Sequence, residues 1–341
     1  MKIKYLVTGG AGFIGSNYVH RLLNRGEQVL IYDNLSRGGA ARNLEWLNQE
    51  HGENSFGLIV GDVRDSTGMN EAAAEVDVIV HLAGQVAVTT SVTNPREDFE
   101  ANAIGTFNML EAASLSGRNP IVIYASTNKV YGGMEEVALV DEPTRWRYRD
   151  LANGCPETQP MDFHSPYGCS KGAGDQYVRD YARIYGLPTV VMRQSCIYGP
   201  RQFGIEDQGW VAWFIIAAVM GRPLTIYGDG KQVRDILHVD DLLDAYDRAI
   251  ERISVAAGQV YNIGGGPGNV MSVWTEFRPK LEQLLGASIE VARADWRPGD
   301  QRVFYADISK AERELGWKPK VGVDEGVQKL FEWVKQNRAL F

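Results

Sequence analysis

Tyr167 and Lys171 stand at positions i and i+4 of the chain. If this segment is helical, both side chains lie on one face and point toward the same spot. A phenol has a pKa of about 10 and is a poor base at neutral pH, but a nearby ammonium and a second cation stabilise the phenolate and lower that pKa. The pair is therefore suited to remove the proton of an alcohol while hydride leaves its carbon. The same spacing also arises by chance in many helices.

A hydroxyl-bearing segment follows the apolar run 120–125 and supplies a third candidate group. A hydroxyl at the carboxyl end of a sheet strand can bond the oxygen of a reacting alcohol. Thr127 is the residue we expect there, with Ser126 as its neighbour. A helix cap or a turn is the alternative role for such hydroxyls.

A glycine-rich turn follows the first apolar run, Tyr5–Thr8, and precedes a helical pattern. Glycines at this junction permit a tight turn and let the backbone approach a pyrophosphate, which the N-terminus of the next helix attracts. A plain tight turn is the alternative. The residues that we expect to contact a dinucleotide here are Gly9, Gly12, Phe13, Ile14 and Gly15.

Asp33 ends the second apolar run, where an acid accepts hydrogen bonds from the adenosine ribose and repels a 2′-phosphate. This favours NAD over NADP, although Arg37 nearby could serve a 2′-phosphate. Asn34, Ser36 and Arg37 complete this candidate cofactor segment.

Two further strand ends carry candidate cofactor contacts. Asp62, followed by Val63, could accept from an adenine amino group, or it could cap a helix. The small residues after His81 would let a cofactor lie close to the backbone, or they could reflect close packing alone. The candidates at that position are Leu82, Ala83 and Gly84.

Apolar runs and helical patterns alternate through the first half of the chain. Continuous Val, Ile and Leu runs are typical of strands buried on both faces, and their alternation with helices predicts a parallel sheet. We expect strands at Tyr5–Thr8, Gln28–Tyr32, Gly57–Val60, Val76–Leu82, Pro120–Ala125, Pro188–Arg193 and Val260–Ile263, and helices near 14–24, 67–74, 97–116, 168–185 and 274–285. The predicted fold class is α/β, a doubly wound parallel Rossmann sheet with a smaller C-terminal lobe.

The strand–helix rhythm breaks after about residue 193, where Gly and Pro become frequent. We therefore predict a Rossmann domain for NAD over 1–192, to which 233–263 returns. Residues 193–232 and 264–341 are expected to form a substrate-binding lobe. A chain of 341 residues is long enough for two such parts.

Composition narrows the classes of partner and compartment. The net charge of −8 argues against nucleic acid, because phosphate backbones bind basic faces. Three cysteines without CxxC spacing make a disulfide framework or a metal site unlikely, and they fit a reducing compartment. The apolar start of the chain is too short for a signal peptide or a membrane span. We expect a cytoplasmic protein with no membrane partner and no metal.

Together the glycine turn, the acid, the strand-end hydroxyl and the Tyr–Lys pair resemble the extended short-chain dehydrogenase/reductase family over nearly the whole chain. The resemblance implies NAD bound across the sheet, with Thr127, Tyr167 and Lys171 as catalytic residues. It also implies that Asn102 supports the lysine. By analogy, the helices near 97–116 and 168–185 would form a homodimer interface.

The choice of reaction depends on the residues after Thr127. Sugar-nucleotide dehydratases of this family carry an acid pair there, whereas this chain has Asn128 and Lys129, which counts against dehydration. Epimerisation or simple reduction remains. Arg234 and Arg297 resemble the family's diphosphate-binding arginines, and Asp300 resembles its ribose-binding acid.

Several segments in combination resemble the CDP-sugar 2-epimerases within this family. The resemblance implies oxidation at C2 of a CDP-linked hexose, of the CDP-paratose to CDP-tyvelose type with CDP-glucose as a further candidate, followed by reduction on the other face. The candidates to hold the sugar, besides Thr127, are Gln85, Thr89, His164 and Ser195. A UDP-sugar 4-epimerase on the same scaffold is the alternative enzyme, and a non-catalytic NAD-binding sensor is the alternative outside catalysis.

Overall fold

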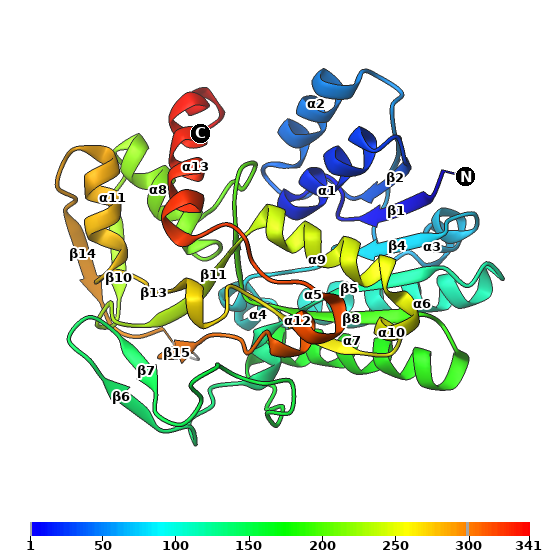
Figure 1. Ribbon diagram of the computed structural model, residues 1–341. Coiled ribbons are helices and arrows are strands. Elements are labelled where there is room, and N and C mark those ends of the chain that lie inside the picture. Colours follow the sequence, from blue (N-terminus) through cyan, green and yellow to red (C-terminus); the bar gives the residue numbers. More distant parts are fainter. Residues whose placement is uncertain (1, 298–299) are drawn as a thin grey trace. The chain divides into compact units, whose positions relative to one another are not determined.

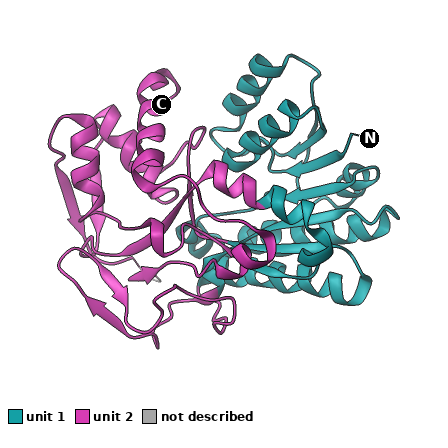
Figure 2. Cartoon of the chain, in the orientation of Figure 1, with its two compact units in different colours: residues 1–130, 165–193, 246–261 teal, residues 131–164, 194–245, 262–341 magenta. Residues whose placement is uncertain are grey.

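The computed structural model describes residues 2–297 and 300–341. The chain divides into two compact units (Figure 2). Unit 1 contains residues 1–130, 165–193 and 246–261. Unit 2 contains residues 131–164, 194–245 and 262–341. The boundary passes through α9 (Val239–Glu251) and β12 (Val260–Ile263), so single elements contribute to both units.

A seven-stranded sheet is the centre of unit 1, with strand order β12-β8-β5-β4-β1-β2-β3. Neighbouring strands pair in parallel, for example β1 with β2 and β1 with β4. The chain reverses its direction of travel across the sheet between β3 and β4, which places a topological switch point beside β1. The strands are β1 (Lys4–Thr8), β2 (Gln28–Asp33), β3 (Gly57–Val60), β4 (Val78–His81), β5 (Ile121–Thr127) and β8 (Thr189–Gln194), with β12 at the edge.

Helices cover both faces of this sheet (Figure 1). On one side α1 (Phe13–Asn24) packs against α2 (Ala40–His51), and on the other α3 (Ser66–Ala73), α6 (Gly105–Leu115) and α7 (Ser165–Tyr185) form a layer. Side chains of this second layer and of the strands share one buried apolar cluster that includes Leu6, Ile79, Met109 and Val178. The predicted doubly wound Rossmann sheet is confirmed.

The helical segment predicted over 97–116 is divided into several elements. A short helix, α4 (Val88–Thr93), precedes it. The segment itself begins within α5 (Pro95–Phe99), continues as a π-helical turn η1 (Glu100–Ile104), and only then becomes α6. A π-turn places one extra residue in the helix and is frequent at functional sites. Periodicity alone did not reveal this interruption, nor did it predict α2.

Unit 2 is a mixed assembly of short strands and helices. In one sheet β11 (Val233–His238) pairs in parallel with β9 (Cys196–Tyr198) and β15 (Val303–Phe304) and antiparallel with β13 (Val270–Ser272). Its core joins α8 (Trp210–Met220), α11 (Phe277–Leu285) and α13 (Val323–Gln336). The remaining elements are η2 (Asn128–Tyr131), β6 (Leu139–Asp141), β7 (Trp146–Tyr148), β10 (Leu224–Tyr227), α10 (Ile253–Ala256), η3 (Pro267–Asn269), β14 (Val291–Ala294), α12 (Ser309–Leu315) and η4 (Arg338–Leu340), of which η2 and α10 lie wholly or mainly in unit 1.

The observed division differs from the predicted one mainly in two segments, and residue 193 and residues 262–263 also lie on the other side of the boundary. Residues 131–164 belong to unit 2, although the sequence placed them in the Rossmann domain. Residues 233–245 also belong to unit 2, because β11 pairs with strands of that unit rather than with the parallel sheet. Within the described parts of the chain, every helix is too short or too polar to cross a bilayer.

Candidate active site

Thr127, Tyr167 and Lys171 lie in one buried region of unit 1. Thr127 ends β5, and the other two follow one another on the first turns of α7. Their exposed fractions are 7%, 8% and 6%. The Thr127 side chain acts on the phenol of Tyr167 and lowers its pKa. The structure therefore brings together the three side chains that the motifs indicated.

The phenol of Tyr167 sits in an environment that opposes its ionisation. Burial raises its pKa above the usual value, whereas the hydrogen bond with Thr127 lowers it. The charge of Asp98 raises the pKa further, and Arg37 opposes it. The chain alone therefore holds Tyr167 protonated at neutral pH.

Lys171 points into the same interior. Its Nζ lies 4.4 Å from the centroid of the Tyr124 ring, a cation–π distance. Burial lowers the pKa of Lys171 to about 8, while Asp175 and Asp98 act to raise it.

Ser126 has a partner of its own. Its hydroxyl donates to Asp175 Oδ2 at 2.8 Å, and Asp175 forms a bidentate ion pair with Arg193 at 2.8 and 2.9 Å. Arg193 and Asp175 are both buried. Because this carboxylate engages Ser126, only Thr127 of the two neighbouring hydroxyls is directed at Tyr167.

The glycine turn has the backbone that its sequence requires. Gly9 has φ +69°, and a Cβ there would come within 2.8 Å of the Ala83 nitrogen. A Cβ on Gly15 would come within 2.2 Å of the Gly9 carbonyl oxygen. Gly12 begins α1 without a side-chain cap, and Phe13 and Ile14 form its half-buried first turn. The helix N-terminus is thus open to an anion.

Asp33 is tied to this turn. Its Oδ2 accepts from the Ala11 N–H at 3.0 Å and its Oδ1 accepts from the Leu35 N–H at 2.8 Å. Burial raises the pKa of this carboxyl, and the two backbone donors oppose that effect. Arg37 and Ser36 are exposed.

The Asp62 carboxylate is already engaged by side chains. Arg64 donates to both of its oxygens at 2.8 and 2.7 Å, and Asn34 donates to Oδ2 at 2.9 Å. The bond to Arg64 is the largest of the effects that hold the Asp62 pKa far below its usual range. Val63 beside it is buried, so its side chain serves packing in this structure. An adenine amino group would have to share the carboxylate with Arg64.

Asn102 lies within the π-turn and is fully engaged. Its Nδ2 donates to Asp98 Oδ1 at 3.2 Å and to Ser170 Oγ at 3.1 Å. Its Oδ1 accepts from the Gln85 N–H at 2.9 Å, in the loop that contains Leu82, Ala83 and Gly84. The resemblance predicted that Asn102 supports Lys171. In this structure the amide joins the loop after β4 to α5 and α7.

The two sugar-binding candidates of unit 1, Gln85 and Thr89, differ in whether their side chains already have hydrogen-bond partners. The Gln85 amide closes on its own loop through Ala87, at 2.7 and 2.6 Å. Thr89 Oγ1 is buried and has no hydrogen-bond partner among the described residues. An unpartnered buried hydroxyl is costly, so Thr89 remains a stronger candidate for a ligand contact than Gln85.

The predicted nucleotide-binding residues lie in unit 2. Arg234 Nη2 donates to Asp300 Oδ1 at 2.6 Å, so two of these residues contact each other. Arg297 stacks 3.9 Å above the Tyr227 ring and pairs with Asp207 at 3.2 Å. Pro298 and Gly299, which belong to the same motif, lie outside the described residues.

Ser195 and His164 receive little support as sugar contacts. The Ser195 hydroxyl bonds the side chain and the backbone carbonyl of Asp235. Asp235 is fully buried and also accepts from the N–H groups of Gly266 and Ala306, each at 3.1 Å. His164 is exposed, directly before α7. Ser195 thus belongs to a buried hydrogen-bond network around Asp235 in unit 2.

Sequence reasoning missed the polar groups behind the catalytic side chains. Asp98 and Ser170 are buried, at 1% and 2% exposure, and hydrogen-bonded to one another. One signal was available, because Asp98 precedes Asn102 by one helical turn and Ser170 lies inside the Tyr–Lys motif. Asp175 and Arg193 are distant in the sequence and left no local signal.

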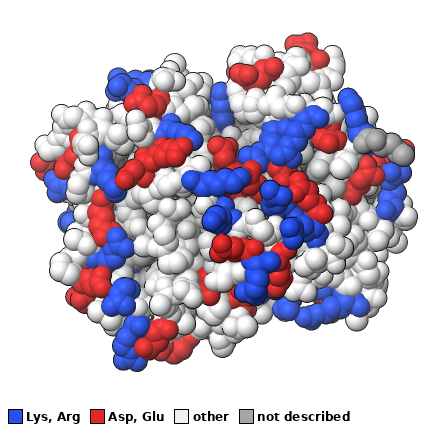
Figure 3. Space-filling model, in the orientation of Figure 1, with Lys and Arg blue, Asp and Glu red and all other residues white. Residues whose placement is uncertain are grey.

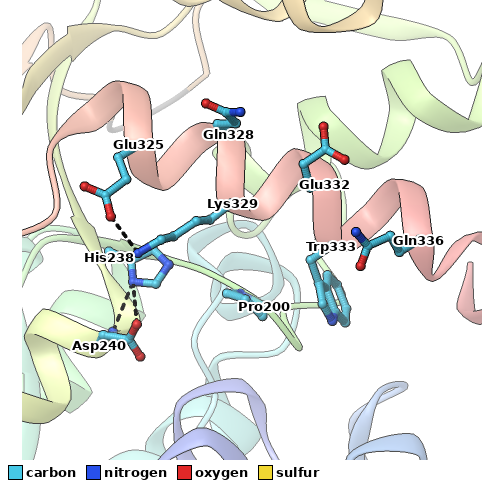
Figure 4. A pocket seen from close by; sticks show the side chains of 9 residues that line it. All are labelled: Pro200, His238, Asp240, Glu325, Gln328, Lys329, Glu332, Trp333 and Gln336. Carbon is cyan, nitrogen blue, oxygen red and sulfur yellow. Dashed lines mark hydrogen bonds and ion pairs between the residues drawn. The ribbon is translucent and has the colours of Figure 1, made fainter.

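A cavity of about 470 Å³ in unit 2 contains none of the predicted residues (Figure 4). Three carboxylates line it, from Asp240, Glu325 and Glu332. The cation there, Lys329, is paired with Glu325 at 2.7 Å. This excess of negative charge is unsuited to a diphosphate. Among the described residues, no group of three or more His, Cys, Asp or Glu side chains could hold a metal ion.

Comparison with known proteins gives the family. The model of the GDP-mannose 4,6 dehydratase family matches residues 6–330. The chain belongs to this family. Among its members, the CDP-paratose 2-epimerase of Salmonella typhi is 45% identical over 338 residues, which cover 97% of this chain and 99% of that protein.

Solved structures of the family agree with the fold. The UDP-glucose 4-epimerase of Thermotoga maritima with UDP-glucose has a TM-score of 0.84 and 32% identity, and the match covers 98% of this chain and 100% of that one. The dTDP-glucose 4,6-dehydratase DesIV of Streptomyces venezuelae with NAD has a TM-score of 0.85 and 30% identity, with 99% of each chain covered. The predicted enzyme class and membership of the extended short-chain dehydrogenase/reductase family are confirmed.

Proposed function

We propose that this enzyme is an NAD-dependent epimerase that inverts C2 of a CDP-linked hexose through a 2-keto sugar. The observation that carries the proposal is the 45% identity to a CDP-paratose 2-epimerase over nearly the full length of both chains. CDP-paratose and CDP-glucose are the substrates that we assign for testing. Because similar proteins include dehydratases, membership of the family alone does not determine the reaction.

The residues after Thr127 favour epimerisation over dehydration. Elimination of water needs a general acid and a base beside the sugar. Asn128 and Lys129 stand where the dehydratases of this family carry their acid pair. Asn128 is buried and accepts a hydrogen bond from Thr127 at 3.4 Å. A neutral amide at this place cannot supply the acid.

The residues around the glycine turn fit NAD. A side chain on Gly9 or Gly15 would fill the space beside the turn, and the open N-terminus of α1 suits a pyrophosphate. Asp33 at the end of β2 suits ribose hydroxyls rather than a 2′-phosphate. When bound, NAD would supply the carbon that accepts and returns hydride, and its positive charge would favour the phenolate of Tyr167.

The three catalytic candidates then have separate tasks. Tyr167 takes the proton of the C2 hydroxyl and returns it after reduction on the opposite face. Thr127 holds the phenol and the sugar oxygen through its hydroxyl, as its hydrogen bond with Tyr167 supports. Lys171 contributes positive charge to the same interior and can hold the ribose of the cofactor. The sugar changes no net oxidation state, so NAD is not consumed.

We assign the nucleotide to unit 2. Arg234 and Arg297 are the cations proposed for the diphosphate, because guanidinium groups match phosphate oxygens. Both are paired with carboxylates in this structure, with Asp300 and Asp207 respectively. Diphosphate binding would replace these carboxylates as partners and would release Asp300 for a ribose hydroxyl.

A UDP-sugar 4-epimerase is the second candidate. The UDP-glucose 4-epimerase of Mycolicibacterium smegmatis is 35% identical over 337 residues, covering 98% of this chain. The chemistry of Thr127, Tyr167 and Lys171 is the same in both cases. The two candidates differ only in the base that is bound and in the carbon that is oxidised.

Product analysis tests the proposal. The purified protein is incubated separately with CDP-paratose, CDP-glucose and UDP-glucose without added cofactor, and the products are separated by chromatography. We expect conversion of a CDP-sugar to its C2 epimer, with no net formation of NADH. Conversion of UDP-glucose to UDP-galactose alone would replace the proposal with the second candidate. In a separate incubation with added NADH, stoichiometric consumption of that NADH would indicate a reductase.

We further propose that the enzyme forms a homodimer through one face of unit 1. Apolar side chains are exposed along α5, η1, α6 and α7, which is unusual for a free surface. They are Phe99, Ile104, Phe107, Leu115, Tyr177, Ile184 and Tyr185. Light scattering of the wild type and of a Tyr177→Glu variant tests this, since the charge should give monomers.

The charge distribution supports a small-molecule substrate rather than nucleic acid. On the face drawn in Figure 3, basic and acidic side chains of the described residues alternate, without an extended basic surface. The net charge of −8 agrees. We propose a cytoplasmic location, which free cysteines at positions 155, 169 and 196 support.

A further inference from the structure

Asp98 is a buried carboxyl that the proposed mechanism does not use. It is 1% exposed and lies in α5. Ser170 Oγ donates to its Oδ2 at 2.5 Å, and Asn102 Nδ2 donates to its Oδ1 at 3.2 Å. Both oxygens thus act as acceptors, which is the pattern of an ionised carboxylate.

Ser170 connects this carboxylate to the catalytic helix. The serine lies immediately before Lys171, and its hydroxyl is also 3.2 Å from the Tyr167 carbonyl oxygen. A hydroxyl has a single proton to donate. The shorter of the two contacts indicates that Ser170 donates it to the Asp98 carboxylate. Asn102 donates to the same hydroxyl at 3.1 Å. The orientation of Ser170 is therefore fixed from both sides.

Asn102 extends the network to the loop after β4. Its Oδ1 accepts from the Gln85 N–H, and it lies in the π-turn η1, where an extra residue shifts the helix face. Asp98, Asn102 and Ser170 together join α5, the π-turn, α7 and the loop of Gln85. Each of these segments lies in unit 1.

We propose that Asp98 is a positioning residue, which holds Ser170 and Asn102 so that α7 presents Tyr167 and Lys171 correctly and which supplies a fixed negative charge beside them. Nothing in the sequence motifs assigns it this task. The inference rests on the proposed function of Tyr167 and Lys171. It concerns how those groups are held and tuned, and not which sugar is bound.

The charge of Asp98 acts on Tyr167. It raises the pKa of the phenol, in addition to burial, because a nearby anion disfavours the phenolate. Thr127 and Arg37 act in the opposite direction. Removing the charge of Asp98 should therefore allow Tyr167 to ionise at lower pH.

The same charge acts on Lys171. Burial lowers the pKa of this lysine, and Asp175 and Asp98 raise it. Asp175 is neutralised by its ion pair with Arg193, whereas Asp98 has only uncharged hydrogen-bond partners among the described residues. Two other side chains, Tyr124 and His81, also face the lysine.

These groups are aromatic and uncharged at neutral pH. Burial raises the pKa of Tyr124, under the ammonium, well above its usual value. Burial and Lys171 lower the pKa of His81 to about 3. Removal of the Asp98 charge should therefore lower the pKa of Lys171 without breaking the ion pair of Asp175 with Arg193.

The test is the Asp98→Asn variant, compared with wild type across pH. We expect both limbs of the pH–rate profile to move to lower pH by about 1 unit, because both groups lose the same anion. Turnover at the optimum should fall by about tenfold or more, as expected for loss of a charge-assisted hydrogen bond. A purely structural residue would lower the rate without moving the limbs.

A readout without substrate accompanies the rate measurement. Phenolate absorbance of the NAD-bound protein is recorded against pH, and the curve of the Tyr167→Phe variant is subtracted. In Asp98→Asn the Tyr167 titration should also move to lower pH. If the titration and both limbs stay where they are in wild type, the inference is wrong.

Two further variants keep the test decisive. Ser170→Ala retains the carboxylate and removes the link, so its effect on turnover should not add to that of Asp98→Asn in the double variant. Asp247→Asn is the matched control, because Asp247 is also buried in unit 1 but pairs with Arg21 and Arg25. It should change stability and leave the pH profile in place. Should Asp98→Asn not fold, Ser170→Ala decides the inference. Its turnover should fall while its Tyr167 titration stays in place, because the carboxylate is retained; wild-type turnover or a displaced titration contradicts the inference.

Failure of the proposed function is recognised separately. If Tyr167→Phe retains full activity, the assignment of Tyr167 is wrong, whatever Asp98 does. If Tyr167→Phe is inactive while Asp98→Asn keeps the wild-type pH profile, only the inference about Asp98 fails.

Discussion

Ser126 and Thr127 are consecutive residues of β5 whose hydroxyls face different partners. Ser126 donates to Asp175 at 2.8 Å, inside a buried ion pair. Thr127 acts on the phenol of Tyr167, whose pKa it lowers. Neighbouring strand residues point to opposite faces of a sheet, so one hydroxyl supports the core and the other is available for chemistry.

This difference predicts separable effects of two similar substitutions. Thr127→Ala should lower turnover by about 10²-fold or more, as removal of a hydrogen bond to the reacting oxygen does elsewhere, with little loss of stability. Thr127→Ser should recover much of the activity. Ser126→Ala should mainly lower the thermal midpoint. The prediction fails if Ser126→Ala, while fully folded, lowers turnover more than Thr127→Ala does.

Tyr167→Phe should abolish turnover and retain NAD. Loss of a general acid–base group lowers rates by about 10²–10⁴-fold, and the ring that packs in the site is kept. Turnover is measured by product chromatography and bound NAD by absorbance after denaturation. Tyr5→Phe is the matched control, because Tyr5 is also a buried tyrosine of unit 1. That control should behave as wild type.

Activity should decline as pH rises through about 8. Burial lowers the pKa of Lys171 to about 8, so the ammonium is lost above this pH. A pH–rate profile on the alkaline side measures this limb. An activity that stays constant up to pH 10 would contradict the assignment.

The same group makes a prediction about stability. The folded pKa of Lys171, about 8, is below the ordinary value of 10.5, so between these values the unfolded chain binds more protons. Its contribution should therefore make the fold more stable as pH rises through this window, by on the order of a few kcal/mol in total. Lys171→Met should remove that slope, as measured by denaturant unfolding at several pH values.

The buried pair of Asp175 and Arg193 should be important for folding. Removing one partner of a buried ion pair leaves an uncompensated charge and costs about 3–5 kcal/mol. Asp175→Ala should therefore lower the free energy of unfolding by this amount. Glu251→Gln is the control, because Glu251 pairs with Arg248 at the surface, where such pairs contribute about 0–1 kcal/mol.

Asp33 should govern the choice of cofactor. Asp33→Asn removes the charge that repels a 2′-phosphate, so NAD should bind about tenfold more weakly and NADP relatively better. Titration of both cofactors by fluorescence measures the ratio. Asp77→Asn, which changes a half-exposed acid paired with Arg118, should leave it unchanged. An unchanged ratio in Asp33→Asn would contradict the ribose assignment.

Local patterns were sufficient for the parallel sheet and its helices. Strand Gln28–Asp33, for example, contains the continuous apolar run Val29–Tyr32, and such runs are typical of buried parallel strands. The interruption of the long helix before Gly105 was not predicted, because the π-turn depends on contacts of Asn102 with Ser170 and Gln85, which are distant in sequence. Segment 131–164 was misassigned because short strands lack a strong local pattern.

The sequence by itself determined which catalytic groups are present. The Tyr–Lys spacing, the strand-end Thr127 and the glycine turn depend on helix, strand and turn geometry, which are local properties. Only the tertiary structure decided which hydroxyl acts on Tyr167 and which carboxylates act on Lys171. It also decided that Ser195 is hydrogen-bonded to Asp235. The physical reason is that hydrogen bonding and burial are set by residues far apart in the chain, and these contacts assign each polar group its partner.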